Sequence, residues 1–268
     1  MGVGAWLLRR GRAAEDARMM MRMALDLLIV LVPLQIFLGD QHGLNTLEYQ
    51  PAKLAAIEGR YDTAQPAPLT LFGIPDDDAA TMRNAIEIPD LGSLILTHSW
   101  NGAIKGLKEW PADQRPPVGL PFFAFRIMVG IGVIMLLVVI VGQVLQLRGR
   151  LWDAVWYQRL CQLVAPLGFF AVIAGWITTE VGRQPWTVYG VLRTADSVSP
   201  SLTGANVAWS LAFYIVVYLI MFPTGIAFMA SLVRRGPQQA ELEPPAQQIE
   251  SGRPHEPFES AARVTPQV

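Results

Sequence analysis

Lys53 and Glu58 are the first residues whose types and spacing could do chemistry. They flank the short apolar run LAAI, and Pro51 and Gly59 predict the two ends of a short helix around them. Near a membrane surface, a carboxylate can accept a proton from a hydroxylated ligand with an apolar tail, such as a quinol, while an ammonium group stabilises the anion. A solvated amphipathic helix explains the spacing more simply, so the residues alone leave both interpretations open.

Arg126 and Met128 form a second candidate site, in the segment FRIMVGIG. A thioether is a soft ligand that suits haem iron, and an arginine can pair with a haem propionate. Gly130 and Gly132 would let a flat partner approach the backbone. A methionine that fills a gap in a helix bundle, beside an arginine that reaches toward the membrane surface, fits the composition more simply.

Glu180 and Arg183 are a third candidate, in the segment GWITTEVGRQPW between Trp176 and Trp186. Tryptophan is enriched where a span meets the membrane interface. The carboxylate there could be a metal ligand, a member of a proton relay, or the partner of Arg183 in an interfacial ion pair. The residues alone do not choose among these roles.

The three histidines, His42, His98 and His255, all lie outside the apolar stretches. The chain therefore offers no intramembrane bis-histidine haem site and no histidine-rich copper site. Its single cysteine, Cys161, excludes an intramolecular disulfide and a CxxC motif.

Four apolar stretches must position these candidates. Hydrophobic residues make up 52% of the chain and charged residues only 16%, against roughly a quarter in soluble domains. Each stretch approaches or exceeds the ~20 residues that a helix needs to cross a bilayer. We therefore predict an all-α, polytopic transmembrane helix bundle with about four full spans and one large extracytoplasmic loop. The expected spans are 19–38, 120–147, 157–180 and 207–233, and Gly39 and Gly43 predict the end of the first.

The charges between the spans predict their orientation. Arginines cluster before the first span, between the second and third, and after the fourth, whereas the long loop holds more acidic than basic residues. The positive-inside rule then places the C-terminus in the cytoplasm and the long loop on the opposite side. The expected connecting segments are the end of a truncated helix with a cytoplasmic connection at 1–18, the extracytoplasmic loop at 39–119, a cytoplasmic loop at 148–156, a second outer loop at 181–206, and a disordered cytoplasmic tail at 234–268.

Taken together, three motifs resemble subunit I of the cytochrome bd-type quinol oxidases, in the cyanide-insensitive branch with a short quinol loop. The motifs are GDQHGLNTLEYQPAKLAAIEG, FRIMVGIG and GWITTEVGRQPWTVYGVLRT, in this order. The resemblance implies a bacterial inner-membrane enzyme of the aerobic respiratory chain that oxidises ubiquinol and reduces dioxygen to water. It implies a low-spin haem b, a high-spin haem b, and haem d or a third haem b, and it makes the extracytoplasmic loop periplasmic and quinol-binding.

The resemblance also implies roles for the candidate residues. It assigns Lys53 and Glu58 to quinol binding and oxidation, Met128 to the iron of the low-spin haem b with Arg126 nearby, and Glu180 to the iron of the high-spin haem b with Arg183 close to the haems. These roles are expectations at this point.

A complete subunit of that family has nine spans, and this sequence would supply the last four and the end of a fifth. We therefore expect it to act with a missing N-terminal half of subunit I and with oxidase subunit II, in lipid, and without nucleic acid. One alternative is a haem-free quinone-binding or assembly module derived from that subunit. An unrelated four-span transporter ranks lower, because transporters usually place polar groups near the bilayer midplane, whereas Arg126, Glu180 and Arg183 fall at span ends.

Overall fold

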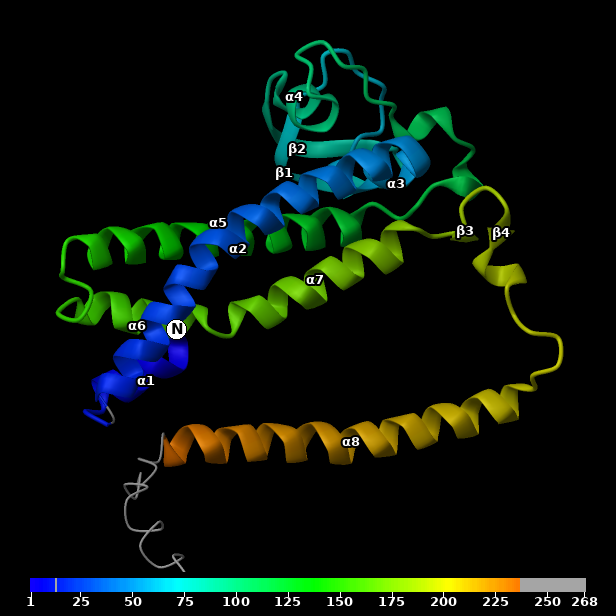
Figure 1. Ribbon diagram of the computed structural model, residues 1–268. Coiled ribbons are helices and arrows are strands. Elements are labelled where there is room, and N and C mark those ends of the chain that lie inside the picture. Colours follow the sequence, from blue (N-terminus) through cyan, green and yellow to red (C-terminus); the bar gives the residue numbers. More distant parts are fainter. Residues whose placement is uncertain (13, 237–268) are drawn as a thin grey trace, which may run out of the picture.

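The computed structural model describes residues 1–12 and 14–236, and it is mostly helical (Figure 1). Four of its helical segments are long and apolar enough to cross a membrane, which confirms the predicted multi-span bundle. They are α2 (Ala14–Tyr49), α5 (Gly119–Leu147), the pair α6 (Val155–Val164) and α7 (Leu167–Gly182), and α8 (Gly204–Arg235). The part of the predicted disordered tail from residue 237 onward lies outside the described residues.

Helix α2 is longer at both ends than the span expected at 19–38. Gly39 and Gly43 do not end it, so that expectation was wrong. A glycine inside a helix costs only about 1 kcal/mol, which the surrounding helical residues offset. The helix ends at Tyr49, because a residue that precedes a proline is restricted to extended conformations, and Gln50 before Pro51 has φ −138°.

The third span is broken at Pro166 into α6 and α7. Proline lacks the backbone N–H that an uninterrupted helix would need there, and its ring clashes with the preceding turn. The two pieces share one apolar stretch, which is why the sequence predicted a single helix from 157 to 180.

The core of the bundle lies where α2, α5 and α6 meet, around Tyr157. The Tyr157 side chain is fully buried, and its hydroxyl donates a hydrogen bond of 2.9 Å to the carbonyl oxygen of Val138 in α5. Gly142 lets these helices approach, because a Cβ atom there would lie 2.1 Å from the Tyr157 hydroxyl and 2.7 Å from Leu25 Cδ1. The short helix α1 (Gly2–Arg9) packs against α2 and α6 next to this core.

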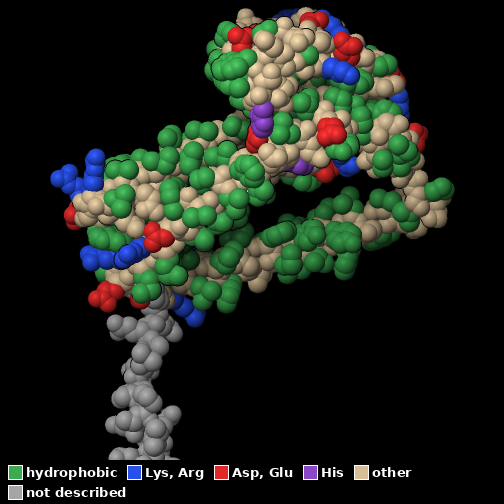
Figure 2. Space-filling model, turned by 45° about the horizontal axis from the view of Figure 1, so that its top comes forward, with side chains coloured by type: hydrophobic (Ala, Val, Ile, Leu, Met, Phe, Trp, Pro, Cys, Tyr) green, Lys and Arg blue, Asp and Glu red, His purple; other side chains and the backbone are tan. Residues whose placement is uncertain are grey.

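Helix α8 runs beside the bundle without packing into it (Figures 1 and 2). None of its residues is buried within the described chain, although its span is as apolar as that of α2. One polar contact reaches it, from the Arg12 Nη1 atom to the carbonyl oxygen of Arg234 at 3.2 Å. All faces of α8 are therefore open to lipid or to other protein.

The loop between α2 and α5 carries secondary structure of its own. It holds α3 (Pro51–Glu58), the antiparallel hairpin of β1 (Leu69–Asp76) and β2 (Thr81–Ile88), and α4 (Leu91–Thr97). Two short 3₁₀ turns follow, at Leu107–Glu109 and Ala112–Gln114, and a third lies at Thr194–Asp196. A smaller hairpin, of β3 (Trp186–Val188) and β4 (Leu192–Arg193), follows α7. The bundle is thus helical, as predicted, and its loops add two small sheets.

We predict that Gly142→Ala destabilises the bundle by about 1–3 kcal/mol, because the added methyl group overpacks the contact between α5, α2 and Tyr157. Gly225→Ala in α8 is the matched control, since nothing lies within 4 Å of its added Cβ. Thermal unfolding of the two variants in detergent, followed by circular dichroism, measures the difference. Equal midpoints for the two variants would contradict this account of the core.

Candidate functional site

Helix α3 holds Lys53 and Glu58 in a buried position. Pro51 starts the helix at its first turn, and Gly59 ends it in the left-handed conformation with φ 68°. A side chain at Gly59 would be strained there, and its Cβ would also lie 2.7 Å from Phe122 Cδ2. Lys53 is only 8% exposed and Glu58 only 3% exposed, so this helix is not the solvated amphipathic helix that the spacing also allowed.

Glu58 faces Arg126, which reaches toward it from the first turns of α5. The Arg126 Nη2 atom lies 3.7 Å from Oε2 of Glu58, and this oxygen is buried without a hydrogen bond among the described residues. Burial raises the pKa of Glu58, and the charges of Arg126 and Arg60 oppose that rise. Glu58 is therefore a carboxylate with a raised proton affinity and one free acceptor oxygen.

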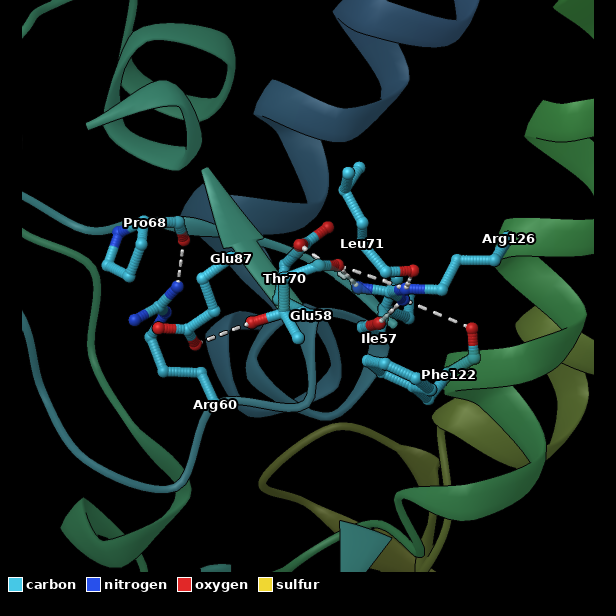
Figure 3. A network of polar contacts seen from close by, with 9 residues as sticks. All are labelled: Ile57, Glu58, Arg60, Pro68, Thr70, Leu71, Glu87, Phe122 and Arg126. Carbon is cyan, nitrogen blue, oxygen red and sulfur yellow. Dashed lines mark hydrogen bonds and ion pairs between the residues drawn. The ribbon is translucent and has the colours of Figure 1, made fainter. Parts of the chain in front are cut away.

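The guanidinium of Arg126 joins three separate segments (Figure 3). It donates hydrogen bonds to the carbonyl oxygens of Ile57 at 2.8 Å, of Phe122 at 3.1 Å and of Leu71 at 3.1 Å, and it also bonds that of Thr70. Its carbon Cζ lies 3.5 Å from the centroid of the Phe122 ring. Arg126 thus connects α3 and β1 to α5, instead of extending freely into solvent.

Lys53 lies at the other side of α3, against the end of α7. A Cβ atom on Gly182 would be 3.4 Å from Lys53 Cγ, so the lysine stem packs on this glycine. Burial lowers the pKa of Lys53; the negative charge of Glu180 counteracts this, while the positive charge of Arg183 adds to it. The structure therefore brings Lys53 close to the third candidate pair, which is 127 positions or more away in the chain.

Glu180 and Arg183 form an ion pair within one helical turn. The Nη2 and Nε atoms of Arg183 lie 2.7 Å and 3.0 Å from the same oxygen, Oε2 of Glu180. Both side chains are half-exposed. Of the three roles that the sequence left open for Glu180, the ion pair is present, and it leaves Oε1 without a hydrogen bond among the described residues.

Met128 lies at the contact between α5 and α7. Its sulfur would be 2.9 Å from a Cβ atom on Gly175, so the thioether fits there because Gly175 has no side chain. Gly130 and Gly132 have nothing within 4 Å of an added Cβ. The half-buried Met128 side chain beside this open stretch of α5 is compatible both with a haem ligand and with a packing residue.

Sequence reasoning missed the groups that hold Arg126 in place. Its four hydrogen-bond acceptors are backbone carbonyl oxygens. Every residue type has such an oxygen, so the sequence does not predict which ones Arg126 binds. Arg60, two residues after Glu58, could have been noticed as a charge close to the apolar run. The described residues, 1–12 and 14–236, contain no group of three or more His, Cys, Asp or Glu side chains that could hold a metal ion.

Comparisons with known proteins agree on one family. The family model described as cytochrome bd terminal oxidase subunit I matches residues 1–237. The cytochrome bd ubiquinol oxidase subunit 1 of Bacillus subtilis is 38% identical over 193 residues, which cover 68% of this chain and 41% of that protein. The cytochrome bd-II ubiquinol oxidase subunit 1 of Escherichia coli is 28% identical, over 92% of this chain and 61% of that protein.

The solved structure of the bd oxidase from Geobacillus thermodenitrificans matches with a TM-score of 0.76 and 30% identity, over 88% of this chain and 54% of that chain. The chain therefore spans about half the length of the curated relatives that it matches. The family match extends over all the described helices and all six candidate residues. On this evidence the chain belongs to the cytochrome bd terminal oxidase subunit I family.

Proposed function

We propose that this chain is part of the haem-bearing catalytic subunit of a bd-type quinol oxidase, which oxidises ubiquinol and reduces dioxygen to water. The observation that carries the proposal is the burial of Lys53 and Glu58 on one short helix, between the ends of α5 and α7. The family membership and the oxidoreductase names of the relatives support it. Because the relatives are about twice as long, we propose that the chain acts with the remaining part of subunit I and with oxidase subunit II.

Glu58 is the proposed acceptor of a quinol hydroxyl proton. Its free Oε2 atom can accept the hydrogen bond of the hydroxyl, and its raised pKa matches the task of a general base. Lys53, at the other side of α3, is the proposed group that stabilises the quinol anion, because its side chain is buried and its stem is fixed against Gly182. Arg126 fixes the position of Glu58 through the carbonyl oxygen of the neighbouring residue Ile57.

The proposed haem groups are a low-spin haem b, a high-spin haem b, and haem d or a third haem b; when bound, they carry the electrons from quinol to dioxygen. The half-buried thioether of Met128, beside the open glycines, would hold the iron of the low-spin haem b. The Oε1 atom of Glu180, left free by its ion pair with Arg183, fits a ligand of the high-spin haem b. Each residue supplies one ligand, so the remaining ligands must come from elsewhere in the assembly.

We further propose a place in the bacterial inner membrane with the loop between α2 and α5 in the periplasm and the C-terminus in the cytoplasm. Helices α2, α5 and α8 and the α6–α7 pair support a multi-pass protein. Arg148 and Arg150 lie at the end of the bundle away from that loop. By the positive-inside rule, basic residues next to a span favour the cytoplasmic side. Figure 2 shows Lys and Arg side chains, with some acidic ones among them, at that end, and acidic and basic side chains mixed over the loop.

A haem-free quinone-binding or assembly module is the second candidate function. One observation favours it: Lys53, Glu58 and Arg126, with every carbonyl that holds Arg126, all come from the described residues. The proposed haem sites, by contrast, each take only one ligand from this chain. The two candidates differ in whether the assembled protein contains haem iron.

We predict that Glu58→Gln slows quinol oxidation by roughly 10²–10⁴-fold, because the amide cannot accept the hydroxyl proton. The assay is the steady-state oxidation of a reduced ubiquinone analogue by membranes in which this chain is produced together with the N-terminal part of subunit I and subunit II. Glu48→Gln is the matched control, since Glu48 is an exposed glutamate at the end of α2. If Glu58→Gln oxidised quinol as fast as Glu48→Gln, the proposed role of Glu58 would be refuted.

We predict that Met128→Leu removes the low-spin haem b band from the reduced-minus-oxidised spectrum of the same membranes, because leucine keeps the volume but cannot bind iron. Met229→Leu, an exposed methionine of α8, should leave the spectrum unchanged. A persistent low-spin band in Met128→Leu speaks against the ligand assignment. A wild-type sample with quinone-analogue binding but no haem bands would favour the haem-free module.

A further inference from the structure

A cavity of about 320 Å³ lies between the end of α3 and the β1–β2 hairpin, and its wall begins at Gly59, the residue that follows Glu58. Polar groups form much of its wall, with Arg60 and Thr70 on the side of α3 and β1, and Glu87 on β2. Such a cavity has room for several water molecules and enough polar partners to hold them. Glu87 is exposed, so the cavity wall extends from buried groups to a carboxylate in contact with solvent.

Two buried side chains lie between Glu58 and Glu87. The Thr70 hydroxyl donates a hydrogen bond of 3.0 Å to Oε1 of Glu87, while the Thr70 carbonyl oxygen accepts from Arg126, the partner of Glu58 (Figure 3). Arg60 is 8% exposed, and its Nη2 atom donates to the carbonyl oxygen of Pro68. The charges of Glu58 and Glu87 both act on the Arg60 guanidinium, which therefore stands near both carboxylates.

The Nε atom of Arg60 is buried and has no hydrogen-bond partner among the described residues. A buried N–H group without a partner costs about 1–3 kcal/mol, so in native proteins such groups usually bind water or a ligand. Glu58 Oε2 is unpartnered in the same way. Arg60 lines the polar cavity, and Glu58 comes one residue before the start of its wall, so ordered water would complete the hydrogen bonding of these two groups.

We propose that Glu87 is the outer group of a proton exit path, which carries the proton from Glu58 through water in this cavity to the solvent beside the β1–β2 hairpin. The inference rests on the proposed role of Glu58 as the acceptor of the quinol proton. Glu58 releases the proton to a cavity water as the Glu87 carboxylate takes one from the water chain, and Glu87 then loses it to bulk solvent. Arg60 stays protonated throughout and orients the water by its Nε donor.

A simple cross-strand contact is the competing explanation for Glu87, because Thr70 and Glu87 are directly opposite in the hairpin. The chain offers a matched case of such a contact. The Thr63 hydroxyl donates a 2.8 Å hydrogen bond to Oε1 of Glu109, an exposed glutamate of the same loop, and neither Thr63 nor Glu109 lines the cavity. Glu109 therefore controls for the loss of a threonine–glutamate hydrogen bond as such.

The test measures how fast the Glu58 carboxyl exchanges its proton with D₂O. Infrared spectroscopy of the purified chain in lipid nanodiscs follows the carbonyl band of the protonated carboxyl group, which is assigned to Glu58 by its loss in Glu58→Gln. We expect Glu87→Gln to slow this exchange about tenfold or more, since a positioned proton-transfer group contributes roughly 10²–10⁴-fold and water replaces part of it. Glu87→Asp should restore most of the rate, and Glu109→Gln should match the wild type.

Equal exchange rates in Glu87→Gln and Glu109→Gln would overturn the exit path, and so would a Glu87→Asp variant as slow as Glu87→Gln. No quinol or haem is needed for this measurement, so its result is independent of the quinol-oxidation assay. If Glu58→Gln impairs quinol oxidation while Glu87→Gln exchanges normally, the proposed function stands and only the exit path fails.

Discussion

The contact between Glu58 and Arg126 is the constraint on which the rest of the site depends. Moving an ion from water into a protein interior costs several kcal/mol, and losing one partner of a buried pair costs about 3–5 kcal/mol. Arg126 offsets this cost with hydrogen bonds to four backbone carbonyl oxygens, and those carbonyls belong to α3, β1 and α5. A single guanidinium thereby fixes where α3 lies relative to the first turns of α5. The same 3.7 Å separation leaves Glu58 Oε2 without a hydrogen bond, and so leaves it able to accept one from the proposed substrate.

Helix α3 is short, and its rigidity comes from its surroundings. Eight residues are too few for a stable isolated helix, yet every residue from Ala52 to Glu58 is buried. The left-handed Gly59 ends the helix close to Phe122, and the next residue, Arg60, lines the cavity beside the hairpin. Lys53 packs on Gly182 at the end of α7, and Glu58 contacts α5. Two consecutive spans, both far from α3 in the chain, thus hold the two ends of this helix.

Local sequence predicted the parts of the site that depend on residue type and failed where the structure depends on long-range packing. Pro51 and Gly59 define α3 because proline and glycine act on their own backbone. Gly39 did not end α2, because a helix tolerates glycine when neighbouring residues continue it. The hydrogen bonds of Arg126 were unpredictable, since their acceptors are backbone atoms brought together by the hairpin. The ion pair of Glu180 and Arg183 is local, three residues apart in a helix, and was one of the roles foreseen.

This chain contains more of the groups proposed for quinol oxidation than of the groups proposed for haem binding. The groups proposed to oxidise quinol come from one contiguous loop and from the ends of α5 and α7, so their geometry is set by contacts within the described residues. Met128 and Glu180 lie on half-exposed faces, where each can contribute one ligand to a group held also by other protein. Helix α8 is apolar and unburied along its length, which also indicates that other protein or lipid covers it. The proposed proton chemistry at the loop therefore depends on this chain's own fold, whereas the proposed electron transfer through haem would require the surfaces that its helices leave open.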